Sequence, residues 1–142
     1  MTRTQQIQRH DTAVIVVIDE KTSAFVLIKS KSTGLWRSPG DRIRDEDIDP
    51  INPKDRIKAA SNAVKRITRE RTGLTVQARR VVTIHRESGT LYGYAGLADF
   101  GKFSPNDGGE NTRIVPYQEV PSLDMSMMQR EIFEIITDWI QS

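Results

Sequence analysis

The sequence feature that most constrains the fold is the stretch TAVIVVI at residues 12–18. Its side chains are mostly β-branched and almost wholly apolar, which is typical of a strand covered on both faces. Such a strand lies inside a sheet that has packed layers on either side. A chain of 142 residues is long enough to bury a core of that kind. We therefore expect one α+β domain over residues 1–142, with a mixed sheet between helices.

Four further stretches have the composition of strands. They are residues 24–29, 75–85, 91–103 and 113–117. A segment rich in acidic residues, 41–54, has neither a helical nor a strand period, so we expect it to be an exposed loop inserted before the next helix. The polar residues 1–10 are expected to form a flexible N-terminus.

Two helices are predicted, one in the middle of the chain and one at its end. The first is expected to have Asn52 as its N-cap and Pro53 in its first turn, and to end with Gly73 in a left-handed conformation. The second is expected from about Asp124. Its apolar residues recur every three or four positions and predict one buried face: Met128, Ile132, Ile136, Trp139 and Ile140.

Composition excludes several classes of site. The chain has no cysteine, which rules out disulfides, thiolate metal sites and cysteine nucleophiles, and is compatible with a reducing cytoplasm. Its net charge is only +2 with both signs interleaved, so we expect no nucleic-acid partner. No apolar run is long enough to cross a bilayer, and the first ten residues lack the apolar run of a secretory signal. We expect a cytoplasmic protein with no membrane partner.

Two short motifs lie in the order that one family uses. LWRSPG at residues 35–40 follows two predicted strands, and RITRERTGL at residues 66–74 ends the predicted central helix. Together they resemble the two ends of the motif of the Nudix, or MutT-like, hydrolases. The resemblance covers nearly the whole chain and implies a Nudix-like fold. It also implies Mg²⁺- or Mn²⁺-dependent cleavage of nucleoside diphosphate derivatives, in which glutamates on one helix face hold the metal against a diphosphate.

The acidic centre of this motif is mostly missing. With Thr72-Gly73-Leu74 aligned on the family's motif, its acid triplet falls on Ile67, Glu70 and Arg71, so Glu70 alone is retained. Ile67 falls on an apolar helical stripe and is expected to be a core residue; the stripe is Ile57, Ala60, Val64 and Ile67. A cation at Arg71 opposes metal binding. Where the motif has a second glycine and a first glutamate, this chain has Asp41 and Lys58.

The resemblance implies three candidate site residues. Glu70 is the candidate catalytic residue and metal ligand, and Gly40 is expected to let the backbone approach a phosphate. Arg66 matches the arginine of the motif and is a candidate ligand-binding residue. Trp36 and Arg37 lie beside the turn, where they could contact a base or a phosphate.

Three functions remain open at this point, of which one, a protein interaction or regulatory domain that makes no use of the ligand cleft, has no sequence feature in its favour. In the first of the other two, the protein is a non-hydrolysing module that binds a nucleotide-like ligand or a protein partner and needs no metal. Arg66 and Arg71, free of glutamates and metal, would then contact the anion directly. In the second, it is a divergent Mg²⁺- or Mn²⁺-dependent hydrolase. Glu70 would be helped by acids from two loops, which are otherwise ordinary solvated loops: Asp41, Asp45, Glu46, Asp47, Asp49, Asp107 and Glu110.

Overall fold

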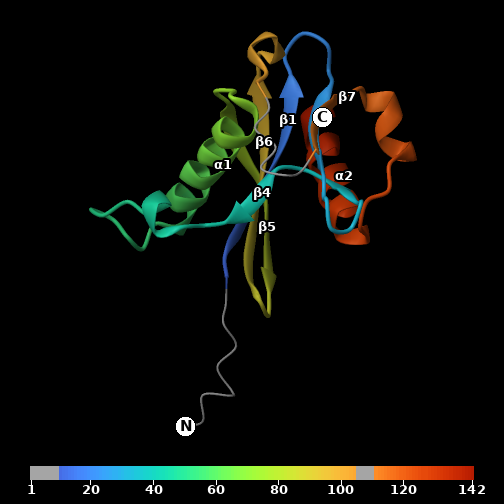
Figure 1. The fold of residues 1–142 in the computed structure, drawn as a ribbon. Coiled ribbons are helices and arrows are strands. Elements are labelled where there is room, and N and C mark those ends of the chain that lie inside the picture. The colour runs from blue at the N-terminus through green and yellow to red at the C-terminus, as the bar shows by residue number, and fades with distance from the viewer. Residues whose placement is uncertain (1–9, 105–110) are drawn as a thin grey trace.

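The structure, a computed structural model, describes residues 10–104 and 111–142. A sheet lies between two long helices, with α1 (Arg56–Thr72) on one face and α2 (Met127–Gln141) on the other (Figure 1). The predicted α+β architecture, a mixed sheet between helices, is confirmed. Most of the expected flexible N-terminus, residues 1–10, lies outside the described residues. In the part of the chain that is described, no helix is long and apolar enough to span a membrane.

The sheet is built around β1, which has different partners at its two ends. Its strands within the described residues are β1 (Thr12–Asp19), β2 (Phe25–Lys29), β3 (Trp36–Arg37), β4 (Gly40–Arg42), β5 (Gln77–Arg86), β6 (Gly89–Ala98) and β7 (Asn111–Val115). β1 runs parallel to β6 along its whole length. It pairs with β4 at its beginning, where Val14 faces Gly40, and with β2 at its end, where Ile18 faces Phe25. This fork holds the turn between β3 and β4 against β1, through a 2.9 Å hydrogen bond from the Ile15 amide to the Pro39 carbonyl.

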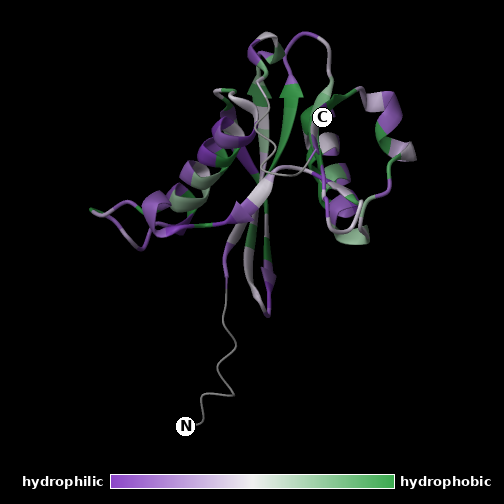
Figure 2. Ribbon diagram, viewed as in Figure 1, coloured by the Kyte–Doolittle hydropathy of each residue, from purple (hydrophilic) through white to green (hydrophobic). Residues whose placement is uncertain are grey.

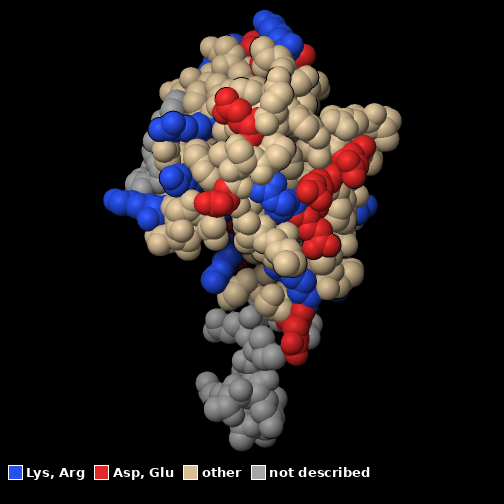
Figure 3. Space-filling view, turned by 90° about the vertical axis from the view of Figure 1, so that its right-hand side faces the viewer, with Lys and Arg blue, Asp and Glu red and all other residues tan. Residues whose placement is uncertain are grey.

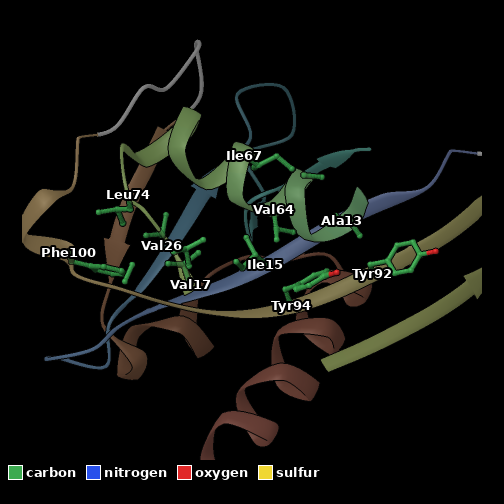
Figure 4. Close-up of a cluster of buried hydrophobic side chains, with 14 of the residues drawn as sticks. Ala13, Ile15, Val17, Val26, Val64, Ile67, Leu74, Tyr92, Tyr94 and Phe100 are labelled. Atoms are coloured by element: carbon green, nitrogen blue, oxygen red, sulfur yellow. The ribbon is translucent and has the colours of Figure 1, made fainter. Parts of the chain in front are cut away.

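Both faces of β1 are buried, as its apolar sequence predicts. Ala13, Ile15 and Val17 pack in the core under α1, whereas Val14 and Val16 belong to the core under α2. This alternation follows from the two-residue period of a strand. Val64 and Ile67 of α1 belong to the same core cluster as Ile15 (Figure 4), and Figure 2 shows the hydrophobic residues concentrated on the central strands. On the α2 side of the molecule, Figure 3 shows basic and acidic side chains interspersed among uncharged ones.

The start of α1 differs from the prediction, whereas its end agrees with it. The N-cap is Asp55 instead of Asn52, and its carboxylate accepts the Lys58 amide at 3.0 Å. Asn52 takes part in a preceding turn, because its carbonyl accepts the Asp55 amide at 3.1 Å. At the other end Gly73 has a φ of 72°, the left-handed conformation that the sequence predicts.

One member of the predicted apolar stripe on α1 is not buried. Ile57, in the first turn of the helix, is 49% exposed. Its backbone carbonyl accepts the Tyr94 hydroxyl at 3.1 Å. The other three members, Ala60, Val64 and Ile67, are buried as expected.

Strand and helix ends in the second half of the chain are corrected as well. The predicted strand 91–103 ends as β6 at Ala98, where the Asp99 carboxylate accepts the Gly101 amide and starts a 3₁₀ turn. The predicted strand 113–117 is β7, which ends before Pro116 because proline has no amide to donate.

The terminal helix begins at Met127 with Ser126 as its N-cap, instead of at Asp124. Its Ile132 and Ile136 are buried, but Met128 and Trp139 remain 44% and 41% exposed.

Candidate functional site

The guanidinium group of Arg66 lies among three carboxylates beside α1. Its Nε and Nη2 donate to the two carboxylate oxygens of Asp47 at 2.9 and 3.0 Å, which is a bidentate ion pair. Its Nη1 lies 3.5 Å from Glu70 Oε2, and its Nε lies 3.6 Å from Glu46 Oε1. The Arg42 carbonyl accepts a further bond from Nη2 at 3.4 Å. A planar guanidinium suits such a bidentate partner better than an ammonium does.

Asp47 comes from the acidic segment 41–54, most of which is exposed, although Asp47 itself is buried. Residues Asp45–Asp47 form a 3₁₀ turn that docks on α1. Asp47 is 3% exposed, its side chain accepts the Arg44 amide at 2.9 Å, and its carbonyl accepts the side-chain amide of Asn62 at 3.0 Å. The expectation that Arg66 is free of glutamates is wrong, because Glu70 and Glu46 lie 3.5 and 3.6 Å from its guanidinium nitrogens.

The environment of this ion pair keeps both groups charged. Burial by itself raises the pKa of the Asp47 carboxyl, but hydrogen bonds from Arg66 and the Arg44 amide hold that pKa below its ordinary value. The hydrogen bond to Asp47 in turn raises the pKa of Arg66. A buried carboxylate is stable only when it is paired and hydrogen-bonded in this way.

The lowered pKa of Asp47 predicts an acid-dependent loss of stability. The contribution of a carboxylate whose folded-state pKa is depressed is fully present above its unfolded pKa, here 3.8, and is lost as the pH falls through the folded value. We expect the Asp47→Asn variant to be less stable than the parent at neutral pH, with a smaller further loss below about pH 4. Urea unfolding between about pH 7 and pH 3 measures this difference. Asp45→Asn, in the same turn but exposed, is the matched control. If the free energy of unfolding falls by the same amount between about pH 7 and pH 3 in Asp47→Asn and in the parent, this would contradict a lowered pKa of Asp47.

A cavity of about 280 Å³ opens at the fork of the sheet. Val14 and Leu91 give it an apolar part, and Ser38 and Gly40 line it from the turn between β3 and β4. The first turn of α2 closes one side with Met128 and Gln129.

The charge around this cavity is predominantly positive. Arg37, Arg42 and Arg86 line it, together with one carboxylate, that of Asp41. That carboxylate accepts the Arg42 amide at 2.8 Å and lies 3.1 Å from Arg44 Nη2, so its charge is already balanced. An anionic ligand therefore fits the cavity better than a cationic one.

The three residues that the sequence predicts in one site lie in two different places in the structure. Glu70 and Arg66 lie together on α1, whereas Gly40 lines the cavity. A Cβ atom added to Gly40 would lie 3.0 Å from the Ala13 carbonyl oxygen, so glycine here lets β4 pack closely against β1. Arg42 contributes to both places, because it lines the cavity and its carbonyl oxygen accepts a hydrogen bond from the Arg66 guanidinium.

Sequence comparison and structure comparison give different results. No protein-family model matches the sequence, and no curated protein is similar to it at a significant level. Among solved structures, the NUDIX domain of Shewanella oneidensis NrtR complexed with ADP ribose superposes with a TM-score of 0.73 at 14% identity, covering 99% of this chain and 94% of that one. A MutT structure from work on Aliivibrio salmonicida and Vibrio cholerae gives 0.71 at 14% identity, covering 92% and 99%. A NUDIX-family hydrolase from Clostridium perfringens gives 0.68 at 14% identity, covering 92% and 97%.

The chain has the Nudix fold. This confirms the fold that the resemblance of LWRSPG and RITRERTGL implies. At 14% sequence identity, these structures show a shared fold but not a shared function.

On this Nudix fold, the residues at the motif positions do not fit a magnesium site. Ile67 is 3% exposed inside the core, and Arg71 brings a positive charge. Glu70 is close to Arg66, so its carboxylate is already near a cation. Within residues 10–104 and 111–142, no group of three or more acidic, histidine or cysteine side chains is placed to hold a metal. Mg²⁺ needs an octahedral set of oxygen ligands, and here the cation among the carboxylates is the guanidinium of Arg66.

The acids proposed as substitute ligands are mostly used in other ways. Asp41 pairs with Arg44, Asp47 with Arg66, and Asp49 with Lys58 at 2.9 Å. The other loop candidates, Asp107 and Glu110, lie outside the described residues. Five acidic residues lie between positions 41 and 49, and nothing in the sequence shows which of them is buried.

Ser38 and Arg86 were not predicted as site residues either. Ser38 lies inside the motif LWRSPG, but nothing in the sequence shows that this residue lines a cavity. Arg86 directly follows the predicted strand 75–85, and its place opposite α2 depends on the packing of the sheet against that helix.

Proposed function

We propose that this protein is a Nudix-fold module that binds a nucleotide-like ligand without hydrolysing it and without a metal. The observation that carries the proposal is the ion pair between Asp47 and Arg66, with Glu70 and Glu46 close by. The guanidinium takes the position among the carboxylates that a metal would need. Ile67 in the core removes a second motif position from metal binding.

The cavity at the fork of the sheet is the proposed ligand site. It combines an apolar part with several cationic side chains, which suits a ligand that has both an organic ring and anionic oxygens. The complex of the NrtR NUDIX domain with ADP ribose supports a ligand of this class on this fold. The absence of cysteine is consistent with the cytoplasm as its compartment.

The expected result is binding of a nucleotide-like ligand with the same affinity in Mg²⁺ and in EDTA. We would titrate ADP-ribose and ADP into the protein by calorimetry under both conditions, because a ligand held by arginines and backbone needs no metal bridge. In parallel, the same compounds and pooled nucleoside diphosphate derivatives would be incubated with Mg²⁺, Mn²⁺ or EDTA, and we expect no product. Binding that requires the metal would contradict the proposal.

Glu70→Gln distinguishes the binding module from a divergent hydrolase. Glu70 and Glu46 are half-exposed and lie near the same guanidinium, which is the arrangement from which a rebuilt metal site would start. The binding module predicts unchanged affinity in Glu70→Gln. The hydrolase predicts a metal-dependent activity that this variant abolishes, with a loss of several kcal/mol of transition-state stabilisation. Such an activity would overturn the proposal.

A further inference from the structure

Two buried polar atoms, on two residues that line the cavity, have no hydrogen-bond partner in the described part of the chain. They are the hydroxyl oxygen of Ser38 and the Nε atom of Arg86. Ser38 is only 1% exposed. Its backbone amide does have a partner, because it donates to the side-chain oxygen of Gln129 at 3.2 Å. The hydroxyl is therefore the donor of Ser38 that has no partner in the described residues.

The rest of the Arg86 side chain is held in place. Its Nη2 donates to the Thr12 hydroxyl at 3.1 Å, and its Nη1 lies 3.5 Å from the Met128 sulfur. These contacts hold the guanidinium beside the cavity, and its buried Nε–H has no hydrogen-bond partner in the described residues. An orphaned buried donor is unfavourable and rare, so two in one cavity need an explanation. Both can donate a hydrogen bond, and one belongs to a positively charged group, so an anionic group with acceptor oxygens would satisfy both of them.

The nearby end of α2 favours the same kind of group. Gln129, which contacts Ser38, and Met128, which contacts Arg86, are neighbours in the first turn of this helix. The amino end of a helix carries a partial positive charge that stabilises anions. Ser38 and Arg86 thus approach the positive end of α2 from the β3–β4 turn and from β5.

We propose that the hydroxyl of Ser38 and the Nε–H of Arg86 bind a phosphate group of the ligand at the amino end of α2. This inference rests on the proposed function and specifies which part of the ligand enters the cavity. A volume of about 280 Å³ is at the lower end of small-molecule sites, so the cavity takes one phosphorylated sugar and not a whole dinucleotide. The phosphate is held by arginine, serine and the helix end, and α1 with its missing metal ligands takes no part.

The test compares ligand affinity with ligand-free stability in matched variants. By calorimetry in EDTA, ADP-ribose, ribose 5-phosphate and inorganic phosphate are titrated into the parent, Ser38→Ala, Arg86→Gln and Arg86→Lys. We expect Ser38→Ala and Arg86→Gln each to weaken binding of the phosphorylated ligands by roughly 10- to 100-fold. Arg86→Lys keeps the charge but loses the Nε donor, so it should also weaken binding.

Stability provides a second readout that a purely structural role would not give. Ser38→Ala removes an unsatisfied buried hydroxyl, so the ligand-free variant should melt at a temperature equal to or higher than that of the parent while it binds ligand more weakly. Arg79→Gln is the charge control, because Arg79 is an exposed arginine of the same strand that borders a different cavity. It should bind like the parent.

The outcomes separate this inference from the proposed function. Parent-like affinity for every phosphorylated probe in Ser38→Ala and both Arg86 variants overturns the phosphate site and leaves nucleotide binding standing. Binding of ribose 5-phosphate or inorganic phosphate that Arg86→Gln abolishes, without any binding of ADP-ribose, supports the phosphate site and overturns the nucleotide-like ligand. A parent protein that binds none of the probes overturns both.

Discussion

Replacing Arg66 with alanine is expected to lower the free energy of unfolding by about 3–5 kcal/mol. The Asp47 carboxylate is 3% exposed and would remain buried without its bidentate partner. Removing one member of a buried ion pair leaves an uncompensated charge, and the desolvation of that charge opposes folding. Denaturation by urea at pH 7, followed by circular dichroism, measures the loss.

Arg69→Ala is the matched control for this prediction, because Arg69 lies on the same helix and is exposed. Its effect should stay within about 0.5 kcal/mol. The double variant Arg66→Ala, Asp47→Ala should be more stable than the sum of the two single losses predicts, since residues in direct contact are not additive. Equal and small effects of Arg66→Ala and Arg69→Ala would show that the buried pair does not form.

Ile67→Glu is expected to destabilise the protein by about 4–7 kcal/mol, although it places an acid at a position where the family motif has one. Ile67 is 3% exposed and packs in the core under α1. Full burial raises the pKa of a carboxyl by up to about 3–5 units, and each unit corresponds to about 1.4 kcal/mol. The variant should therefore be least stable at neutral pH and recover part of its stability as the introduced carboxyl is protonated. Thermal melts between about pH 4 and pH 7 measure this recovery.

Two variants show whether the charge or the altered packing causes this loss. Ile67→Met keeps most of the volume and should lose less than about 1.5 kcal/mol. Arg71→Glu introduces an acid at the neighbouring motif position, which is only partly buried, and should be tolerated better than Ile67→Glu. An Ile67→Glu protein that is as stable as the parent and gains stability from Mg²⁺ would mean that this position still belongs to an accessible metal site.

Local patterns predicted the parts of the fold whose causes lie within a few neighbouring residues. The apolar run at residues 12–18 requires cover on both faces, and β1 has it. Gly73 ends α1 because the left-handed conformation after a helix favours glycine. Ile67 was expected in the core from its position on the helical stripe, and it is there.

Local sequence patterns predicted the ends of helices and strands less reliably, because several neighbouring residues could form the same cap or end. Asn52 and Asp55 are both suitable N-caps, and only the turns of the preceding segment decide for Asp55. The strand period continued past Ala98 in the prediction, but the hydrogen bond of the Asp99 side chain ends β6 there.

The sequence by itself determined the layers of this protein, because the hydrophobic period can be read along the chain. The tertiary structure alone decided which carboxylates surround Arg66. Asp47 and Arg66 are 19 positions apart, and only the docking of a 3₁₀ turn on α1 buries them together. Ser38 and Arg86 meet at one cavity because the sheet forks and α2 packs across the opening. Such contacts depend on distances between elements, which no local pattern of residues contains.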